Sequence, residues 1–197
     1  MAAAKERGGV NVETRDIPGV LVLDSPVWGD DRGFFREWFK LGDLAASGVT
    51  FAAAQANLSR SSFGVVRGLH YSLAPEGQAK VVTCVDGELV DVVVDVREGS
   101  PTFGRVERIP LAAHVGRSVL LPVGVAHGFC VTSESASLAY LLSSPYDAET
   151  ELGVDPFDKE VGVAWPLTAE AIVSERDAAA PSLAARLAAG QLPRYAL

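Results

Sequence analysis

The sequence predicts an all-β sandwich or barrel with short helices near its C-terminal end. Short apolar runs bounded by turn residues recur from about residue 18 to residue 142, at the spacing of about 8–12 residues that is typical of such folds. No part of this region alternates strands with long helices, which argues against a parallel α/β fold. After residue 143 the sequence becomes polar and rich in turn residues.

The first half of the chain contains the clearest strand signals. Residues 19–28 (GVLVLDSPVW) predict a strand, residues 29–33 (GDDRG) a turn, and residues 41–48 (LGDLAASG) a short helix. In residues 80–96, two β-branched runs flank the dipeptide Asp86-Gly87, which is a strong signal for a β-hairpin turn. Side chains alternate between the faces of a strand, so the second run carries valines on one face and acids on the other, namely Val90, Val92, Val94 and Val96 against Asp91 and Asp95.

The second half predicts three more strands and a covering segment. The strands are expected at residues 117–124, 127–132 and 137–144. Residues 143–167 predict a loop laid over the barrel. Residues 181–193 (PSLAARLAAGQLP) then predict a short helix, with Ser182 at its N-cap and Gly190 at C′.

Length and composition are those of one folded domain. We expect an N-terminal tail over residues 1–13 and a single domain over residues 14–197, whose helical segment covers about residues 166–197. The net charge of −8 argues against a nucleic-acid partner, although a few local arginines suffice for one small phosphorylated ligand. No apolar run approaches the roughly 18 residues that span a bilayer, and no leader pattern is recognisable, so we expect a cytoplasmic protein without membrane contact. Cys84 and Cys130 lie in apolar runs and are expected to be buried.

One motif raises the question of a metal site. The segment GRSVLLPVGVAH, which ends at His127, resembles the second half of the metal-binding signature of cupins, which are small double-stranded β barrels. The first half of that signature has two histidines and a glutamate, whereas this chain has His70, then Ser72, with Glu76 nearby. A site of His70, Glu76 and His127 is conceivable. Lys80 would place a positive charge beside the cation, so we expect no metal.

Seven segments together resemble the dTDP-4-keto-6-deoxyglucose 3,5-epimerase family. They keep the family's order over residues 14–195 and are DDRGFFREW, RGLHY, QAKVV, DVVVDVREGSPTFGR, PVGVAHGF, AYLLSSPY and SERDAAAP. The resemblance implies a cupin-like jelly-roll barrel without metal or other cofactor. It also implies a homodimer and a dTDP-4-keto-6-deoxyhexose substrate.

The resemblance also assigns roles to individual residues. It implies that His70, paired with Asp177, is the base, that Tyr140 is the acid, and that Lys80 lies near the sugar ketone. Arginines are expected around the diphosphate, and the other matching positions line the sugar and nucleotide pocket. The expected substrate-binding residues are Arg32, Phe34, Glu37, Gln55, Asn57, Arg67, His127, Tyr146 and Arg176.

These residue types suit the inversion of a carbon next to a ketone. A base removes the proton, a cation stabilises the enolate oxygen, and an acid returns a proton to the opposite face. Without the resemblance, His70 and Tyr140 would be interpreted as core residues. Arg67 and His70 are three residues apart and would point to opposite faces of a regular strand, so the sequence requires either a bulge at Gly68 or an approach of Arg67 from another side.

Two departures from the family pattern leave open which ring carbons are inverted. Many members have lysine where this chain has Leu141, and glutamine or an aromatic residue where it has Ser72. Both positions are expected beside the sugar, so the sequence does not decide whether C3, C5 or both are inverted. The alternatives are a single-site epimerase of an antibiotic sugar, a sugar-nucleotide ketoisomerase and a non-catalytic sugar-binding barrel.

Overall fold

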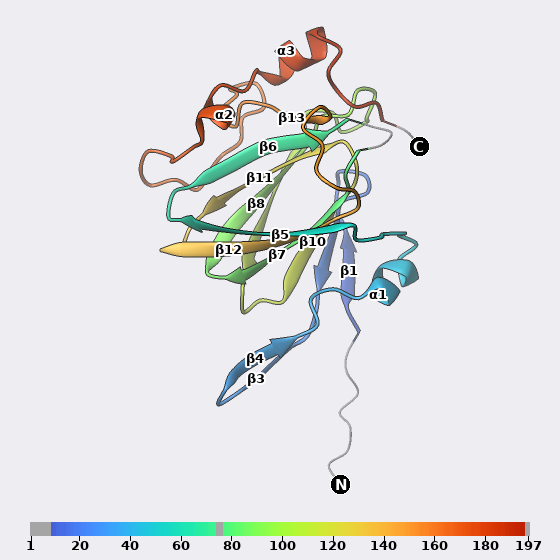
Figure 1. The fold of residues 1–197 in the computed structure, drawn as a ribbon, viewed down its shortest axis with the longest axis vertical. Helices are drawn as coiled ribbons and strands as arrows, with labels where there is room; N and C mark the ends of the chain where they lie inside the picture. The colour runs from blue at the N-terminus through green and yellow to red at the C-terminus, as the bar shows by residue number, and fades with distance from the viewer. Residues whose placement is uncertain (1–8, 74–76, 196–197) are drawn as a thin grey trace.

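A computed structural model describes residues 9–73 and 77–195, and it confirms the predicted all-β jelly roll (Figure 1). The strands of the first antiparallel sheet are, in spatial order, β1 (Asn11–Thr14), β2 (Leu21–Asp24), β10 (Arg117–Leu121), β7 (Lys80–Asp86), β12 (Ser135–Leu142) and β5 (Gln55–Ser62). The second sheet contains β13 (Glu151–Gly153), β6 (Val66–Ser72), β11 (Val125–Val131), β8 (Glu88–Asp95) and β9 (Val106–Ala112). Strand β1 begins inside the expected N-terminal tail.

The prediction of a hairpin at Asp86-Gly87 is wrong. Strands β7 and β8 do follow one another at this turn, and Gly87 has the positive φ of 72° that the turn requires. However, β7 pairs with β10 and β12, whereas β8 pairs with β11 and β9 in the other sheet. The dipeptide therefore turns the chain from one sheet to the other.

The main core lies between the two sheets. It contains aliphatic and aromatic residues of both, including Val82 and Leu138 from the first sheet and Val93 and Phe129 from the second. The alternation within β8 is as predicted, but its acidic face points inward, since Asp91 and Asp95 are completely buried. Because burying a carboxylate is costly, each needs a partner inside the barrel.

The outer faces of both sheets are covered by other parts of the chain. The predicted first helix is present as α1 (Leu41–Ala46), and its Leu44 packs on the first sheet. The valines of β8 lie under the C-terminal segment. That segment contains α2 (Glu175–Ala178) and α3 (Leu183–Ala188), which confirms the predicted C-terminal helix with Ser182 as its N-cap.

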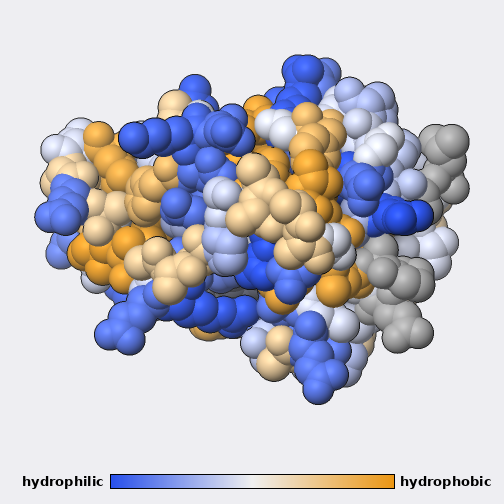
Figure 2. Space-filling view, turned by 90° about the horizontal axis from the view of Figure 1, so that it is seen from above, coloured by the Kyte–Doolittle hydropathy of each residue, from blue (hydrophilic) through white to orange (hydrophobic). Residues whose placement is uncertain are grey.

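The covering loop predicted for residues 143–167 is mostly irregular, but it contributes a strand. Within it, β13 pairs with β6 and completes one edge of the second sheet. Seen from above (Figure 2), this side of the molecule mixes hydrophilic and hydrophobic residues. None of the helices in the described part of the chain is long and apolar enough to cross a membrane.

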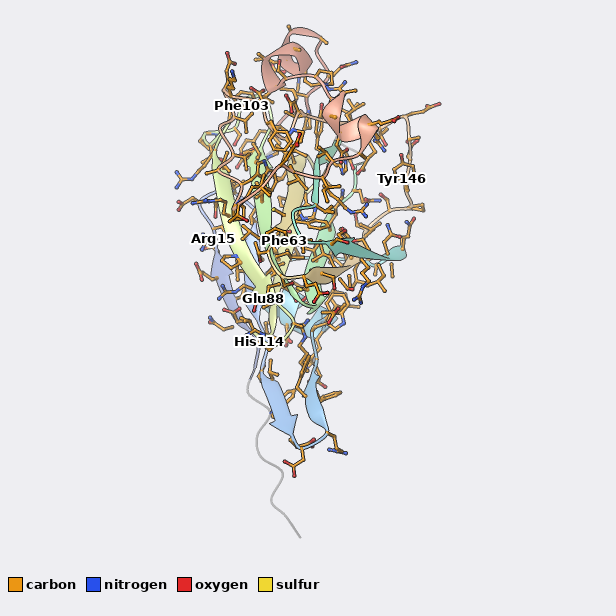
Figure 3. All side chains as sticks on the ribbon, turned by 90° about the vertical axis from the view of Figure 1, so that its left-hand side faces the viewer. Arg15, Phe63, Glu88, Phe103, His114 and Tyr146 are labelled. Atoms are coloured by element: carbon orange, nitrogen blue, oxygen red, sulfur yellow. The ribbon has the colours of Figure 1, made fainter. Side chains whose placement is uncertain are left out.

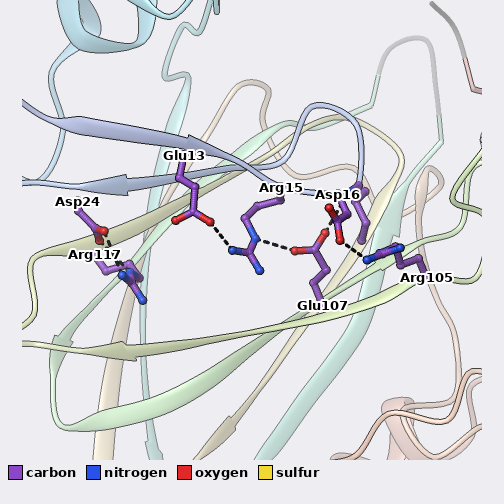
Figure 4. A network of polar contacts seen from close by, with 8 residues as sticks. Glu13, Arg15, Asp16, Asp24, Arg105, Glu107 and Arg117 are labelled. Atoms are coloured by element: carbon purple, nitrogen blue, oxygen red, sulfur yellow. Dashed lines mark hydrogen bonds and ion pairs between the residues drawn. The ribbon is translucent and has the colours of Figure 1, made fainter.

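Ion pairs join the two sheets where the edge strand β1 of the first sheet lies near the edge strand β9 of the second (Figure 4). Glu107 of β9 is buried; it accepts a hydrogen bond of 2.7 Å from Nε of Arg15 and one of 2.9 Å from the backbone N–H of Ile17. Asp16 and Arg105 form a second ion pair nearby. These contacts hold the turn between β1 and β2 on the edge strand of the second sheet.

A hairpin projects from the barrel, as Figures 1 and 3 show. It consists of β3 (Val27–Asp30) and β4 (Gly33–Arg36), and its tip is the predicted turn at residues 29–33. Phe34 and Phe35 are 50% and 58% exposed. Arg36 at the base donates a hydrogen bond of 2.6 Å to the carbonyl of Cys84 and anchors the hairpin to the barrel.

Candidate active site

Strands of both sheets line a cavity of about 520 Å³, a size suited to a small-molecule ligand. Its walls come from β5, β6, β7, β11 and β12, together with the segment that leads into β13. Seven of the predicted site residues contribute to this lining, namely Asn57, Arg67, His70, Lys80, His127, Tyr140 and Tyr146.

A bulge in β6 brings Arg67 and His70 to the same cavity. His127 of β11 is the partner of His70, and Phe129 is the partner of Arg67, so three steps along β6 match two along β11. Gly68 lies in the bulge with a φ of 113°. A Cβ atom there would lie 2.6 Å from the Cα of Gly128, so a larger residue would not fit.

His70 is held by a carboxylate from the C-terminal segment. Its Nε2 lies 2.7 Å from Oδ1 of Asp177, and Oδ2 of Asp177 accepts a hydrogen bond from the backbone N–H of Gly68 at 3.3 Å. Asp177 lies in α2, whose N-cap Ser174 accepts a hydrogen bond from the Asp177 backbone N–H. Burial by itself would raise the pKa of Asp177, but the hydrogen bonds, above all that from His70, lower it below its usual value. Asp177 therefore stays ionised beside the imidazole.

Lys80 forms a largely buried ion pair with a residue that the sequence analysis did not select. Its Nζ lies 3.1 Å from Oε1 of Glu151, and Oε2 of Glu151 accepts a hydrogen bond of 3.0 Å from the hydroxyl of Ser72. Glu151 reaches this position because it pairs with Ser72 across β13 and β6. The ammonium group is thus fixed at the cavity wall.

Tyr140 projects from β12 into the cavity. It pairs with Asn57 of β5 on one side and with Val82 of β7 on the other. Its hydroxyl forms a hydrogen bond of 3.1 Å with Ser59, while burial raises its pKa to about 12. The phenol therefore remains protonated at neutral pH and can act as a proton donor.

The remaining nucleotide-binding candidates on this side form a connected rim. Arg176 donates hydrogen bonds of 3.4 Å to the hydroxyl of Tyr146 and 3.2 Å to the carbonyl of Glu151. The side-chain oxygen of Gln55 accepts a hydrogen bond from the backbone N–H of Tyr146, and its nitrogen donates one to Asn57. Tyr146 lies at the side of the barrel (Figure 3).

Four positions lie elsewhere. Arg32 and Phe34 are on the projecting hairpin, and Glu37 follows directly after it, so none of the three lines the cavity of its own chain. The expectation that Leu141 lies beside the sugar is wrong, because alternation along β12 turns it outward to pack against the cluster around Leu44.

The histidines proposed for a metal site have other partners in the structure. The described residues contain no group of three or more His, Cys, Asp or Glu side chains that could hold a metal ion. Both histidines of the conceived site lie against carboxylates, His70 against Asp177 and His127 against Asp91. Glu76, its third member, lies outside the described residues.

Asp91 and Glu151 are the main site residues that sequence reasoning missed. Asp91 carried one signal, because it interrupts a β-branched strand and shares a face with Val93 of the core. Glu151 carried none, since a carboxylate in a turn-rich stretch is usually solvated.

Comparisons with known proteins find one family over most of the chain. Residues 14–185 match the family model described as dTDP-4-dehydrorhamnose 3,5-epimerase. The chain is 47% identical to a dTDP-4-dehydrorhamnose 3-epimerase of Streptomyces niveus, over 91% of this chain and 87% of that protein. It is 42% identical to a dTDP-4-dehydrorhamnose 3,5-epimerase of Mycobacterium tuberculosis, over 91% of each.

Solved structures are equally similar. A 4-keto-6-deoxy sugar epimerase from the novobiocin gene cluster of Streptomyces spheroides superposes with a TM-score of 0.92 at 42% identity, over 99% of this chain and 98% of that one. A double mutant of a 3′-monoepimerase from Streptomyces bikiniensis, solved in complex with dTDP, superposes with a TM-score of 0.89 at 40% identity, over 92% of each chain.

Proposed function

Since the chain belongs to the dTDP-4-dehydrorhamnose 3,5-epimerase family, we propose that it epimerises a dTDP-4-keto-6-deoxyhexose next to its C4 ketone in deoxysugar biosynthesis. It is an isomerase with a cupin-like fold. Among the similar enzymes named above, those whose names give a position are 3-epimerases or 3,5-epimerases, so inversion at C3 is the step that these names share. The observation that carries the proposal is the hydrogen-bonded pair of His70 and Asp177 in a cavity that also contains Lys80 and Tyr140.

The first chemical step is proton removal by His70. The ketone acidifies the neighbouring C–H, and histidine is the side chain most often used as a general base. The proton passes from carbon to the imidazole, while the C–H electron pair becomes the enolate. Asp177, 2.7 Å away, stabilises the imidazolium that forms. The ammonium group of Lys80 stabilises the negative charge on the enolate oxygen.

The second step is protonation from the other face of the ring. Tyr140 belongs to the first sheet and His70 to the second, so the two side chains enter the cavity from different walls. The hydroxyl of Tyr140 gives its proton to the carbon, and the configuration inverts. The electron pair of the enolate forms the new C–H bond, and exchange with water then removes the proton from His70 and returns one to Tyr140. No electrons leave the substrate, so the reaction as written uses no redox cofactor and no metal.

The nucleotide end of the substrate meets the rim. Arg67 and Arg176 supply the planar donor groups that match diphosphate oxygens. Tyr146 offers a half-exposed ring, and Gln55 and Asn57 offer amide groups next to it. This rim provides positive charge locally in a chain whose net charge is −8.

We further propose that the protein is a homodimer in which the hairpin of one copy completes the cavity of the other. Arg32 and Phe34 lie on a hairpin that projects away from its own barrel. The edge strand β5 lies next to the cavity, and 70% of Leu58 in this strand is exposed. Within the described part of the chain, no strand pairs with the outer side of β5. A second copy is the occupant that would cover both exposed surfaces at once.

The reaction is tested by proton NMR of dTDP-4-keto-6-deoxyglucose in deuterated water with the purified protein. Loss of the H3 signal together with an inverted coupling pattern is expected, and loss of the H5 signal would add C5 to the reaction. Migration of the carbonyl from C4 to C3 would instead identify a ketoisomerase. Binding without exchange of any ring proton would refute catalysis.

The dimer proposal is tested by complementation between two inactive chains. Arg32→Ala and His70→Ala chains are purified separately and then mixed under conditions in which subunits exchange. Each mixed dimer would contain one complete site, so random exchange of equal amounts should restore about a quarter of the wild-type activity. No restoration, with mixed dimers confirmed by mass spectrometry, would show that the hairpin serves its own chain.

A further inference from the structure

The barrel interior contains a second histidine–carboxylate pair that the proposed reaction does not use. Nε2 of His127 lies 2.6 Å from Oδ1 of Asp91. Asp91 is 0% exposed and His127 is 5% exposed. The pair comes from neighbouring strands, because His127 of β11 opposes Val93 of β8, two residues along the same face from Asp91.

Packing alone does not account for Asp91. The surrounding interior positions are aliphatic or aromatic, and they include Val93 and Phe129. Taking a carboxylate out of water is costly even when it is paired, and Oδ2 of Asp91 has no hydrogen-bond partner among the residues that the structure describes. An aliphatic side chain would fill the same space without that cost. We therefore interpret Asp91 as present for its hydrogen bond to the imidazole of His127.

The pair uses only one of the two imidazole nitrogens. Nε2 is occupied by Asp91, whereas Nδ1 has no hydrogen-bond partner among the described residues. His127 itself lines the cavity. The imidazole meets Tyr140 edge-on, with the ring centroids 6.3 Å apart. The ring of His127 thus borders the cavity next to the proposed proton donor.

We propose that Asp91 is a positioning residue that fixes the tautomer of His127, so that Nδ1 accepts a hydrogen bond from a ring hydroxyl of the substrate. The inference rests on the proposed function and adds a specificity element to the same site. Burial raises the pKa of Asp91, while the charge and hydrogen bond of His127 oppose that shift. When the ionised carboxylate holds the proton on Nε2, Nδ1 presents a lone pair, which attracts a hydroxyl and repels a carbonyl oxygen. Lys80, which can only donate, suits the ketone instead. Together the two residues allow only one orientation of the keto sugar.

Two substitutions of Asp91 separate positioning from simple packing. Asp91→Leu removes the acceptor, and we expect the KM for the keto sugar to rise about 5- to 100-fold, the range for leaving a buried hydrogen-bonding group unpaired. Asp91→Asn keeps an oxygen that can accept from Nε2–H, and it should restore most of the loss. The affinity for dTDP alone, which lacks the sugar, should be unchanged in both variants. A Leu variant with a wild-type KM, or an Asn variant as impaired as the Leu variant, would overturn the proposal.

Two further measurements do not depend on the Leu variant. Nitrogen NMR of the wild-type imidazoles, assigned with His70→Asn and His114→Gln variants, should show His127 protonated at Nε2 and unprotonated at Nδ1. A proton on Nδ1, as a protonated Asp91 would produce, would contradict the inference. The 2-deoxy and 3-deoxy substrate analogues each lack one ring hydroxyl, and one of the two should bind the wild type more weakly than the parent sugar nucleotide does. The Asp91→Leu variant should bind that analogue and the parent sugar nucleotide with equal affinity. If the wild type catalyses no ring-proton exchange, the proposed reaction fails, but the tautomer and the binding affinities still test this inference separately.

Discussion

Replacing Asp177 by asparagine should slow the reaction without removing the base. The isosteric amide fills the same space, but it takes away the negative charge that lies 2.7 Å from the His70 imidazole. One hydrogen bond to a charged group is worth about 1.5–3 kcal/mol. Because each 1.36 kcal/mol corresponds to a factor of ten in rate, kcat should fall about 10- to 150-fold if this bond is made chiefly to the imidazolium.

The assay follows ring-proton exchange and product formation together, so that loss of base strength slows both equally. Glu175→Gln is the matched control, because it makes the same change of charge two residues away in the same helix, at an exposed position. It should leave kcat within twofold of the wild type. An Asp177→Asn enzyme with wild-type kcat would refute the role given to this carboxylate, and an equal loss in Glu175→Gln would attribute the effect to the general charge of the helix.

Three further predictions concern the cavity wall and rim. Glu151→Gln should lower the free energy of unfolding by about 1.5–3 kcal/mol, because Lys80 loses its ionic partner; an unchanged urea midpoint would contradict this. The ultraviolet absorbance of tyrosinate, measured as the difference between the wild type and Tyr140→Phe during a pH titration, should give a pKa of about 12 for Tyr140. A pKa at the ordinary value of 10.0 would contradict the claim that burial raises the pKa of this phenol. Arg67→Ala should weaken dTDP binding in calorimetry by about 1.5–3 kcal/mol, while the exposed Arg60→Ala leaves it unchanged; equal affinities for both variants would exclude Arg67 from the diphosphate site.

The fold was largely predictable because alternation and turn residues are local signals. The short helices at Leu41–Ala46 and Leu183–Ala188 were recognisable by the same kind of evidence. Strand pairing was not, because it depends on contacts that are distant in sequence. Asp86-Gly87 supplies a turn in either arrangement, and only the pairing of β7 with β10 and β12 separates it from β8.

The candidate site was predictable where short motifs carried it. Short motifs that can be recognised in the sequence contain His70, Lys80 and Tyr140. The structure brings these three residues to one cavity. Whether Arg67 shares that cavity with His70 could not be decided from spacing, since one bulge reverses the outcome. Glu151 was hidden because its position depends on the pairing of β13 with β6, which the polar sequence around it does not indicate.

The central claim is that His70 and Tyr140 act on opposite faces of one sugar ring, and deuterium incorporation compared with product yield tests it most directly. In deuterated water, His70→Ala should abolish both exchange and product, since general acid–base groups contribute about 10²–10⁴-fold. Tyr140→Phe should still exchange deuterium into the unchanged substrate, because His70 can return a proton to the face from which it took one, but it should form little inverted product. Wild-type product yield from Tyr140→Phe, or wild-type exchange by His70→Ala, would contradict the two-face mechanism.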